Sequence, residues 1–156
     1  MKILVFSDVH GDTRGMERAI LAHGDADAAV FLGDGWLGAE EVFLAHPHLP
    51  HTAVIGNCDS QSAGVCDAVL ELGGVRILCT HGHRYGVKLG RGRLARAAKE
   101  KGASLVFYGH THVAVDETVD GVRMINPGSV GCGSGKSYAV VYIENGAVVC
   151  GFGKGD

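Results

Sequence analysis

Short apolar runs alternate with helix-like patterns in the first third of the chain, and this order constrains the fold more than any other feature of the sequence. The three runs are Ile3–Phe6, Ala28–Leu32 and Thr52–Ile55. Because nearly all their residues are apolar at consecutive positions, each run predicts a strand that is buried on both faces. Such strands are typical of parallel sheets that helices cover on both sides.

Two helices are expected between these strands. The first begins after Asp12 or Thr13, either of which can cap a helix, and its apolar residues keep helical spacing from Met16 to Ile20. The second is a short helix over Trp36–Ala45. Strand, helix, strand, helix and strand in this order predict a parallel sheet with right-handed crossovers.

The rest of the chain predicts more strands and a third helix, over Gly90–Lys101. The strands are expected at Cys66–Leu72, Val75–Cys79, Ser104–Tyr108, Val113–Val119, Val122–Ile125, Tyr138–Ile143 and Ala147–Phe152. Gly73-Gly74 is a strong hairpin signal between the first two, and the last four are expected to form a β-meander. We therefore predict one α/β domain over residues 1–156, with a mixed or two-sheet core.

Composition narrows the class of protein. A hydrophobic content of 46% with 20% charged residues is typical of a globular protein. The net charge of -3 gives no reason to expect a nucleic-acid partner or an anionic membrane. No apolar run approaches the roughly 18 residues that a membrane span needs. The five cysteines form no CxxC pair and no export signal is visible, so a cytoplasmic location is expected.

Polar side chains that can bind metal ions follow five of the expected strands. The candidates at these strand ends are Asp8, His10, Asp34, Asn57, Asp59, His81, His83, His110 and His112. In open α/β sheets, ligands bind just outside the carboxyl ends of the strands. In an extended chain residues i and i+2 point the same way, so Asp8 and His10, like His110 and His112, can aim at one point.

This set of side chains indicates a metal site. Mixed imidazole and carboxylate ligands suit manganese, iron, zinc or nickel rather than calcium. Without Asp59 and His83 the set contains seven ligands, which are too many for one tetrahedral ion but fit two ions that share a carboxylate, as in two-metal hydrolases. Each motif alone is more often a turn, a cap or a polar pair. Their repeated occurrence at strand ends favours the site.

Three other stretches have less specific interpretations. His46, His48 and His51 lie in HPHLPH, whose prolines favour an exposed loop over a metal site. The basic stretch 84–101 is mostly a solvated helix face, although its beginning could attract phosphate substrates. The sequence GCGSGKS at 131–137 lacks the spacing of a phosphate-binding P-loop.

The ordered motifs DVH, GD, GNCD, THGH and GHTH resemble the signature of the calcineurin-like metallophosphoesterases. The resemblance is closest to the small single-domain prokaryotic phosphodiesterase branch, and it includes the turn Asn126–Ser129. It implies a four-layer α/β/β/α sandwich with two mixed sheets and a dinuclear metal site at the strand ends. It also implies that one metal ion is held by Asp8, His10 and His112, that the other is held by Asn57, His81 and His110, and that Asp34 bridges them.

Several residues of this set have implied roles in catalysis beside the metals. Asp34 and Asn57 act there as ligands, and Asp59 is expected to orient them. Cys58 departs from larger family members, in which a histidine contacts the phosphate and protonates the leaving oxygen. A neutral thiol offers neither a cation nor a good acid, so Cys58 either packs or has a chemical role of its own. His83 either faces the substrate or supports the fold.

The resemblance predicts a divalent-metal-dependent phosphodiesterase in which a hydroxide bridging two metal ions attacks phosphorus. Manganese is the first choice of metal, with nickel, iron, zinc and magnesium as alternatives. The expected partner is a small phosphodiester substrate; neither nucleic acid nor a membrane is indicated, and a homo-oligomer is compatible with the sequence. The alternative is a scaffold of the same fold that has lost hydrolysis and binds proteins, as the retromer subunit of this fold does.

Overall fold

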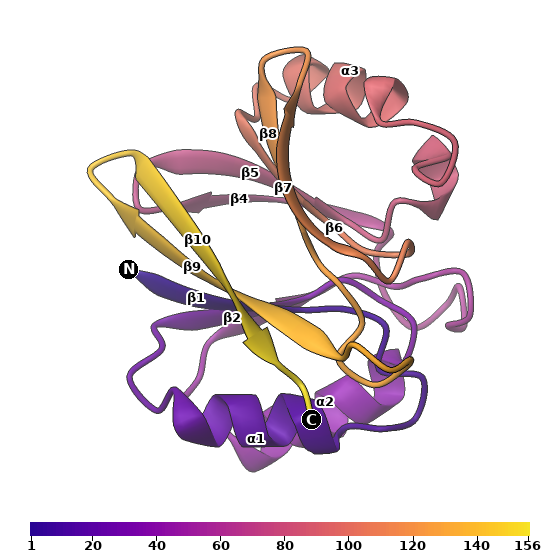
Figure 1. The fold of residues 1–156 in the computed structure, drawn as a ribbon, viewed down its shortest axis with the longest axis vertical. Helices are drawn as coiled ribbons and strands as arrows, with labels where there is room; N and C mark the ends of the chain where they lie inside the picture. The colour runs from indigo at the N-terminus through magenta and orange to yellow at the C-terminus, as the bar shows by residue number, and fades with distance from the viewer.

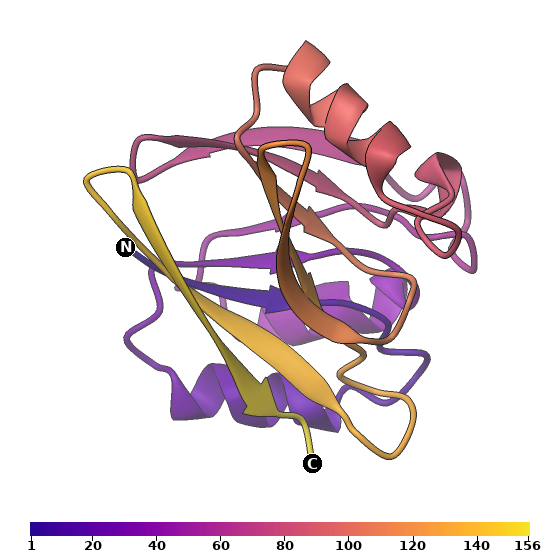
Figure 2. The same ribbon diagram turned by 45° about the horizontal axis from the view of Figure 1, so that its top comes forward.

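The computed structural model describes residues 1–156 and contains two five-stranded sheets that face each other. In Figure 1 the helices α1 (Arg14–Ala22) and α2 (Trp36–Ala45) cover the lower sheet, and α3 (Gly92–Glu100) covers the upper one. Figure 2 shows the same order of layers from another side. The four-layer α/β/β/α sandwich with two mixed sheets is therefore confirmed.

The first sheet combines the three N-terminal strands with the C-terminal hairpin. Its strands are β1 (Lys2–Phe6), β2 (Ala28–Phe31), β3 (His51–Ala53), β9 (Ser137–Glu144) and β10 (Ala147–Lys154). The strand order is β10-β9-β1-β2-β3, with β1, β2 and β3 parallel and β9 antiparallel to both of its neighbours. The carboxyl ends of the three parallel strands consequently meet at one edge.

The second sheet has a parallel centre and antiparallel edges. Its strands are β4 (Asp67–Leu72), β5 (Val75–Thr80), β6 (Leu105–Tyr108), β7 (Ala114–Val119) and β8 (Val122–Pro127). The order is β4-β5-β6-β8-β7, and β5, β6 and β8 run parallel. A short 3-10 helix, η1 (His83–Tyr85), follows β5.

Three apolar clusters fill the three spaces between the four layers. Leu4, Phe31 and Phe43 belong to the cluster between the first sheet and its helices. Val5 and Phe107 belong to the cluster between the sheets, and the third cluster joins α3 to the second sheet. Successive β1 residues enter different clusters because side chains alternate across a strand. The consecutive apolar residues of β1 thus have a direct structural cause.

The predicted β-meander at the end of the chain is wrong in its connectivity. Its four strands form two hairpins in different sheets: β7 pairs with β8 in the second sheet, while β9 pairs with β10 in the first. The chain crosses between the sheets through residues 128–136. Local turn signals identify each hairpin, but the burial of apolar residues from both sheets decides which sheet each hairpin joins.

Smaller differences occur at element ends. The third strand was expected to reach Ile55, but β3 ends at Ala53, and the N–H of Ile55 bonds to the carbonyl of Val65. The N-cap of α1 is Thr13, whose side chain makes no capping hydrogen bond. Asp12 instead accepts a hydrogen bond from the N–H of Arg14 at 3.3 Å. None of the helices has the length and apolarity that crossing a membrane requires.

Candidate metal centre

The facing carboxyl ends of the strands bring most of the candidate ligands together in two groups. The first, which we call the open cluster, consists of Asp8, His10 and His112. His112 Nε2 lies 3.0 Å from Asp8 Oδ1 and 3.3 Å from His10 Nε2. The side chains of His10 and His112 are 30% and 38% exposed. This cluster therefore faces solvent.

The second group, the buried cluster, consists of Asp34, His81 and His110. His81 Nε2 lies 3.3 Å from Asp34 Oδ2 and 3.1 Å from His110 Nδ1. The side chain of His81 is 0% exposed and that of Asp34 is 3% exposed. Asn57 adds an amide oxygen 3.1 Å from His81 Nε2. Two carboxylates link the clusters: Asp34 Oδ2 lies 3.8 Å from His10 Nε2, and Asp8 Oδ1 lies 4.0 Å from His81 Nε2.

The convergence of these side chains has a different cause from the one expected. The extended backbone that would align residues i and i+2 is absent: φ is positive at Asp8, His10, Asp34, His110 and His112. Left-handed backbone is rare for residues other than glycine, and it is concentrated at functional sites. The ligands after β1, β2 and β6 thus converge because the chain bends sharply there, whereas Asn57 and His81 follow their strands without a positive φ.

Asp8 has one oxygen that no hydrogen-bond donor satisfies. Its Oδ2 accepts hydrogen bonds from Ser7 Oγ at 2.5 Å and from the N–H of His110 at 3.1 Å. Its Oδ1 is buried, has no hydrogen-bond partner and lies next to His112. A buried carboxylate oxygen without a hydrogen bond lowers the stability of the fold by about 1–3 kcal/mol or more unless a cation compensates it. This oxygen is oriented for a metal ion.

The ring of His81 is held in one tautomer. Its Nδ1–H donates to the backbone carbonyl of Leu32 at 2.7 Å, so Nε2 is the nitrogen that faces Asp34 and His110 and that can bind a cation once its proton is released. A backbone carbonyl behind one ring nitrogen is the usual way to orient a metal-binding histidine. Burial lowers the pKa of His81, but the nearby Asp34 and Asp8 carboxylates raise it more, so its pKa is above the ordinary value.

The other members of the buried cluster are in the protonation states that bind metals. Burial and the charges of His81 and Lys88 lower the pKa of His110 to about 4, so its imidazole is neutral at neutral pH. Burial raises the pKa of Asp34, but hydrogen bonds from His81 and from the N–H of Cys58 lower it well below its usual range. A neutral imidazole and a carboxylate are both able to coordinate a cation.

Asp59 supports the site through the backbone. Its carboxylate accepts four N–H groups, from Asp34, Gly35, Trp36 and Gly56, at 2.8–2.9 Å. Burial raises the pKa of Asp59, but these four donors lower it more, and the carboxylate stays charged. Because two of the donors open α2, the carboxylate also caps that helix. Asp59 thereby holds the turn that carries Asp34.

Two residues of the turn at 126–129 connect the ligand loops, and the sequence had given them no role. The buried Asn126 donates through Nδ2 to the carbonyl of Gly109 at 2.9 Å, next to His110. Ser129 Oγ donates to the carbonyl of Asp8 at 2.7 Å. The NPGS motif was the available signal, but which backbone each side chain reaches depends on contacts across the fold.

Close contacts at two glycines explain part of the glycine content. A Cβ at Gly56 would collide with Asp34 Oδ1, and one at Gly109 would collide with Ser7 Oγ. Both glycines let another chain segment approach a carboxylate that belongs to the candidate site. Larger residues at either position would displace a candidate ligand.

The other sequence candidates lie around the site or outside it. Cys58 is exposed, and its Sγ is grouped with His10 and Asp34. His83 begins η1, and its ring centroid lies 5.4 Å from that of His81. The histidines of HPHLPH form no metal-binding group: His51 stacks on Phe43 at 4.0 Å between ring centroids. His46 and His48 lie between α2 and β3, whereas His51 begins β3, so the expected loop is shorter than the stretch.

The donor set fits divalent metal ions on structural grounds alone. An unpaired buried oxygen of Asp8, several imidazole nitrogens within about 3–4 Å of one another and the shared Asp34 all point to the same space. The arrangement is suited to binding divalent cations.

Comparisons with known proteins agree with this fold and donor set. The family model of the calcineurin-like phosphoesterase superfamily domain matches residues 1–146. The probable metallophosphoesterase YsnB of Bacillus subtilis is 34% identical over 157 residues, which cover 97% of this chain and 90% of YsnB. The phosphodiesterase YfcE of Escherichia coli is 30% identical over 164 residues, which cover 89% of this chain and 84% of YfcE.

Solved structures show the same fold. The crystal structure of a conserved uncharacterised protein from Streptococcus pneumoniae, a predicted phosphoesterase, superposes with a TM-score of 0.84 at 29% identity and covers 99% of this chain and 89% of that one. A Vps29 mutant from Entamoeba histolytica shares the fold, with a TM-score of 0.78 at 23% identity and 99% coverage of both chains. The chain belongs to the calcineurin-like phosphoesterase superfamily, whose class is that of metal-dependent phosphoric ester hydrolases.

Proposed function

We propose that the protein is a phosphodiesterase that hydrolyses small phosphodiesters with two divalent metal ions. The observation that carries this proposal is the pair of ligand clusters joined by Asp34, next to the unpaired Oδ1 of Asp8. Two clusters joined by one carboxylate match the number of ions in two-metal hydrolases. The name of the relative YfcE, a phosphodiesterase, supports the reaction type.

We assign the open cluster to one ion and the buried cluster, together with Asn57, to the other. When bound, the ions supply an activated water molecule and positive charge for the phosphoryl oxygens. The protein holds their ligands: Leu32 orients His81, Ser7 and the N–H of His110 orient Asp8, and Asp59 holds the turn that carries Asp34. Manganese is the proposed metal, because mixed nitrogen and oxygen ligands accept it readily.

Cys58 is the basis for preferring diesters over monoesters. Burial and the nearby Asp34 carboxylate raise the pKa of the Cys58 thiol, so it is neutral at neutral pH. A monoester dianion carries an extra negative charge that a cation at this position would offset, and a neutral thiol does not. The thiol is also a weak acid for a departing alkoxide. Esters with good leaving groups should therefore react fastest.

His83 is proposed to face the reacting phosphate rather than to bind metal. Its ring centroid lies 6.1 Å from that of His110, on the buried side of the centre. Burial and the charge of His81 lower the pKa of His83, which favours a neutral imidazole. In that state it can donate or accept one hydrogen bond at the substrate.

The scaffold alternative has less support. The likeness to Vps29 is under 25% identity and concerns the fold alone. A scaffold without hydrolysis has no need for a buried, unpaired carboxylate oxygen, which lowers stability unless a cation is bound.

We also propose a single domain over residues 1–156 and a cytoplasmic location. The five free cysteines are compatible with that location.

One assay tests the proposed function directly. The purified, metal-stripped protein is mixed with manganese, nickel, iron, zinc or magnesium and given bis(para-nitrophenyl) phosphate or para-nitrophenyl phosphate. We expect metal-dependent release of nitrophenol, fastest with the diester. Elemental analysis should find two ions per chain. Release from neither substrate with any metal would contradict the proposal and favour the scaffold.

A further inference from the structure

A pocket of about 330 Å³ lies directly beside the candidate metal centre. Three of its lining residues each follow a candidate ligand in the sequence: Gly11, Gly35 and Cys58. Cys58 belongs to both places, because its Sγ is also grouped with His10 and Asp34. A substrate whose phosphorus lies at the ligand clusters therefore has one of its substituents at the mouth of this pocket.

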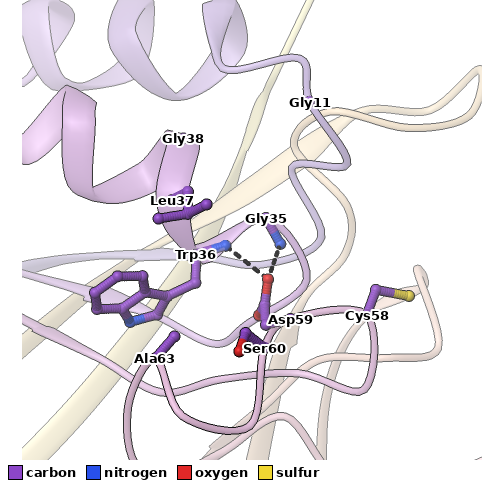
Figure 3. Close-up of a pocket in the computed structure, with 9 residues that line it drawn as sticks. All are labelled: Gly11, Gly35, Trp36, Leu37, Gly38, Cys58, Asp59, Ser60 and Ala63. Atoms are coloured by element: carbon purple, nitrogen blue, oxygen red, sulfur yellow. Dashed lines mark hydrogen bonds between the residues drawn. The ribbon is translucent and has the colours of Figure 1, made fainter.

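Two large apolar side chains at the start of α2 line the pocket. In the view of Figure 3, the indole ring of Trp36 lies between the side chains of Leu37 and Ala63. Leu37 is 73% exposed, and Trp36 is only partly buried against the core. Exposed apolar side chains around a concave site are typical of small-ligand binding. The volume also falls within the range of such sites, about 300–1,000 Å³.

The pocket offers no free charge to an occupant. Its one carboxylate belongs to Asp59, whose two oxygens already accept four backbone N–H groups. The Ser60 hydroxyl is paired with that of Ser62 at 2.9 Å. The pocket has no cationic side chain to bind a second phosphate. An alkyl chain would not stack on the face of the indole ring as an aromatic ring does. The chemistry favours a flat, uncharged ring.

We propose that this pocket binds one ester substituent of the substrate, a planar aromatic group that packs against Trp36. The inference rests on the proposed function and narrows it to diesters that carry an aryl or nucleobase substituent. Trp36 and Leu37 are then specificity-determining residues, because they contact the substituent and not the reacting phosphorus. Gly11 lines the pocket without a side chain, and a Cβ there would have nothing within 4 Å, so this part of the pocket is open.

Binding can be followed without hydrolysis, because Trp36 is the one tryptophan of the chain. Diphenyl phosphate and dimethyl phosphate carry the same charge and differ in the rings. We expect diphenyl phosphate to change the tryptophan emission of the metal-loaded protein saturably, whereas dimethyl phosphate does not. As competitors of bis(para-nitrophenyl) phosphate, their inhibition constants should differ by about tenfold or more, in favour of the diphenyl ester.

Variants connect this difference to the pocket. Trp36→Leu removes the ring, Leu37→Ser removes an exposed contact, and Ala63→Leu fills the space. Each should reduce the ratio of the two inhibition constants about threefold or more, with the constant for dimethyl phosphate unchanged. Leu44→Ser is the matched control, since Leu44 lies on the same helix, is 77% exposed and does not line the pocket. It should leave the ratio unchanged.

The possible failures are distinguishable. If bis(para-nitrophenyl) phosphate is hydrolysed but the two competitors bind equally, or Leu37→Ser and Leu44→Ser behave alike, the pocket has another occupant and the inference is wrong while the function stands. If no diester is hydrolysed with any metal, the proposed function fails. A saturable change in emission would then still identify an aromatic site, but its assignment to a substrate would be overturned.

Discussion

The open cluster and the buried cluster contain similar ligands in different surroundings. In the open cluster the imidazoles of His10 and His112 are about one-third exposed, whereas His81 in the buried cluster has no exposed surface. A buried imidazole needs a fixed partner for each nitrogen, and His81 has one in the carbonyl of Leu32. Two of the three residues in the buried cluster, Asp34 and His81, are thus buried, whereas Asp8 is the one buried residue of the open cluster.

The largest effect is expected from Asp34→Asn, which breaks the link between the clusters. An amide cannot supply two charged oxygens to two ions, so the diester hydrolysis rate should fall by more than about 100-fold, beyond the 10–100-fold typical of supporting groups. Metal content should fall with the fold retained, as measured by elemental analysis and circular dichroism. Asp116→Asn, in β7 and outside both clusters, is the control; it weakens only the ion pair of Asp116 with Arg123. Near-normal activity of Asp34→Asn, together with inactive His110→Ala, would exclude the bridging role.

Removal of the metals should affect the two clusters in sequence. Each ion at 100 times its dissociation constant stabilises the fold by about 2.7 kcal/mol, and chelation removes this contribution. Because solvent reaches the open cluster, its ion should dissociate first as the chelator concentration rises. Thermal unfolding and metal content measured together should show two steps. Loss of both ions in one step would mean that the clusters behave as one site.

Truncation of one histidine from each cluster tests the difference in burial. In metal-free protein, His81→Ala should lower the free energy of unfolding by about 2 kcal/mol, because it leaves a cavity and an unpaired Leu32 carbonyl. His112→Ala should lower it by less than about 0.5 kcal/mol, as is usual for exposed positions. Urea denaturation measures both values. Equal losses would show that burial does not distinguish the clusters.

The smallest effects are expected at Cys58, which borders the open cluster. Cys58→His should raise monoester turnover relative to diester turnover by about tenfold, well below what a fully developed general acid contributes. Cys58→Ala should change diester turnover by less than about twofold, because the neutral thiol supplies little acid catalysis. Steady-state kinetics with both substrates measures the ratio. Loss of diesterase activity in Cys58→Ala would reveal a direct role of the thiol.

The sequence predicted the fold class correctly, and its choice of candidate ligands stays a prediction; both rest on local signals. Continuous apolar runs such as Ile3–Phe6 identify buried strands, and DVH or GHTH at a strand end identifies the chemistry. The reason given for their convergence was wrong, however. The ligands leave the strands through left-handed turns, and a tight turn at Asp8 or His110 is not visible in a pattern of apolar and polar residues.

By itself, the sequence determined the layer-forming elements and the residue types at their ends, since strand period, helix period and ligand chemistry are properties of neighbouring residues. Only the tertiary structure decided which sheet each C-terminal hairpin joins, that Asn126 and Ser129 hold two ligand loops, and that Trp36 borders a pocket at the metal centre. These features depend on contacts between segments far apart in the chain. Such contacts form wherever burial of the whole molecule is most favourable, and no local pattern specifies them.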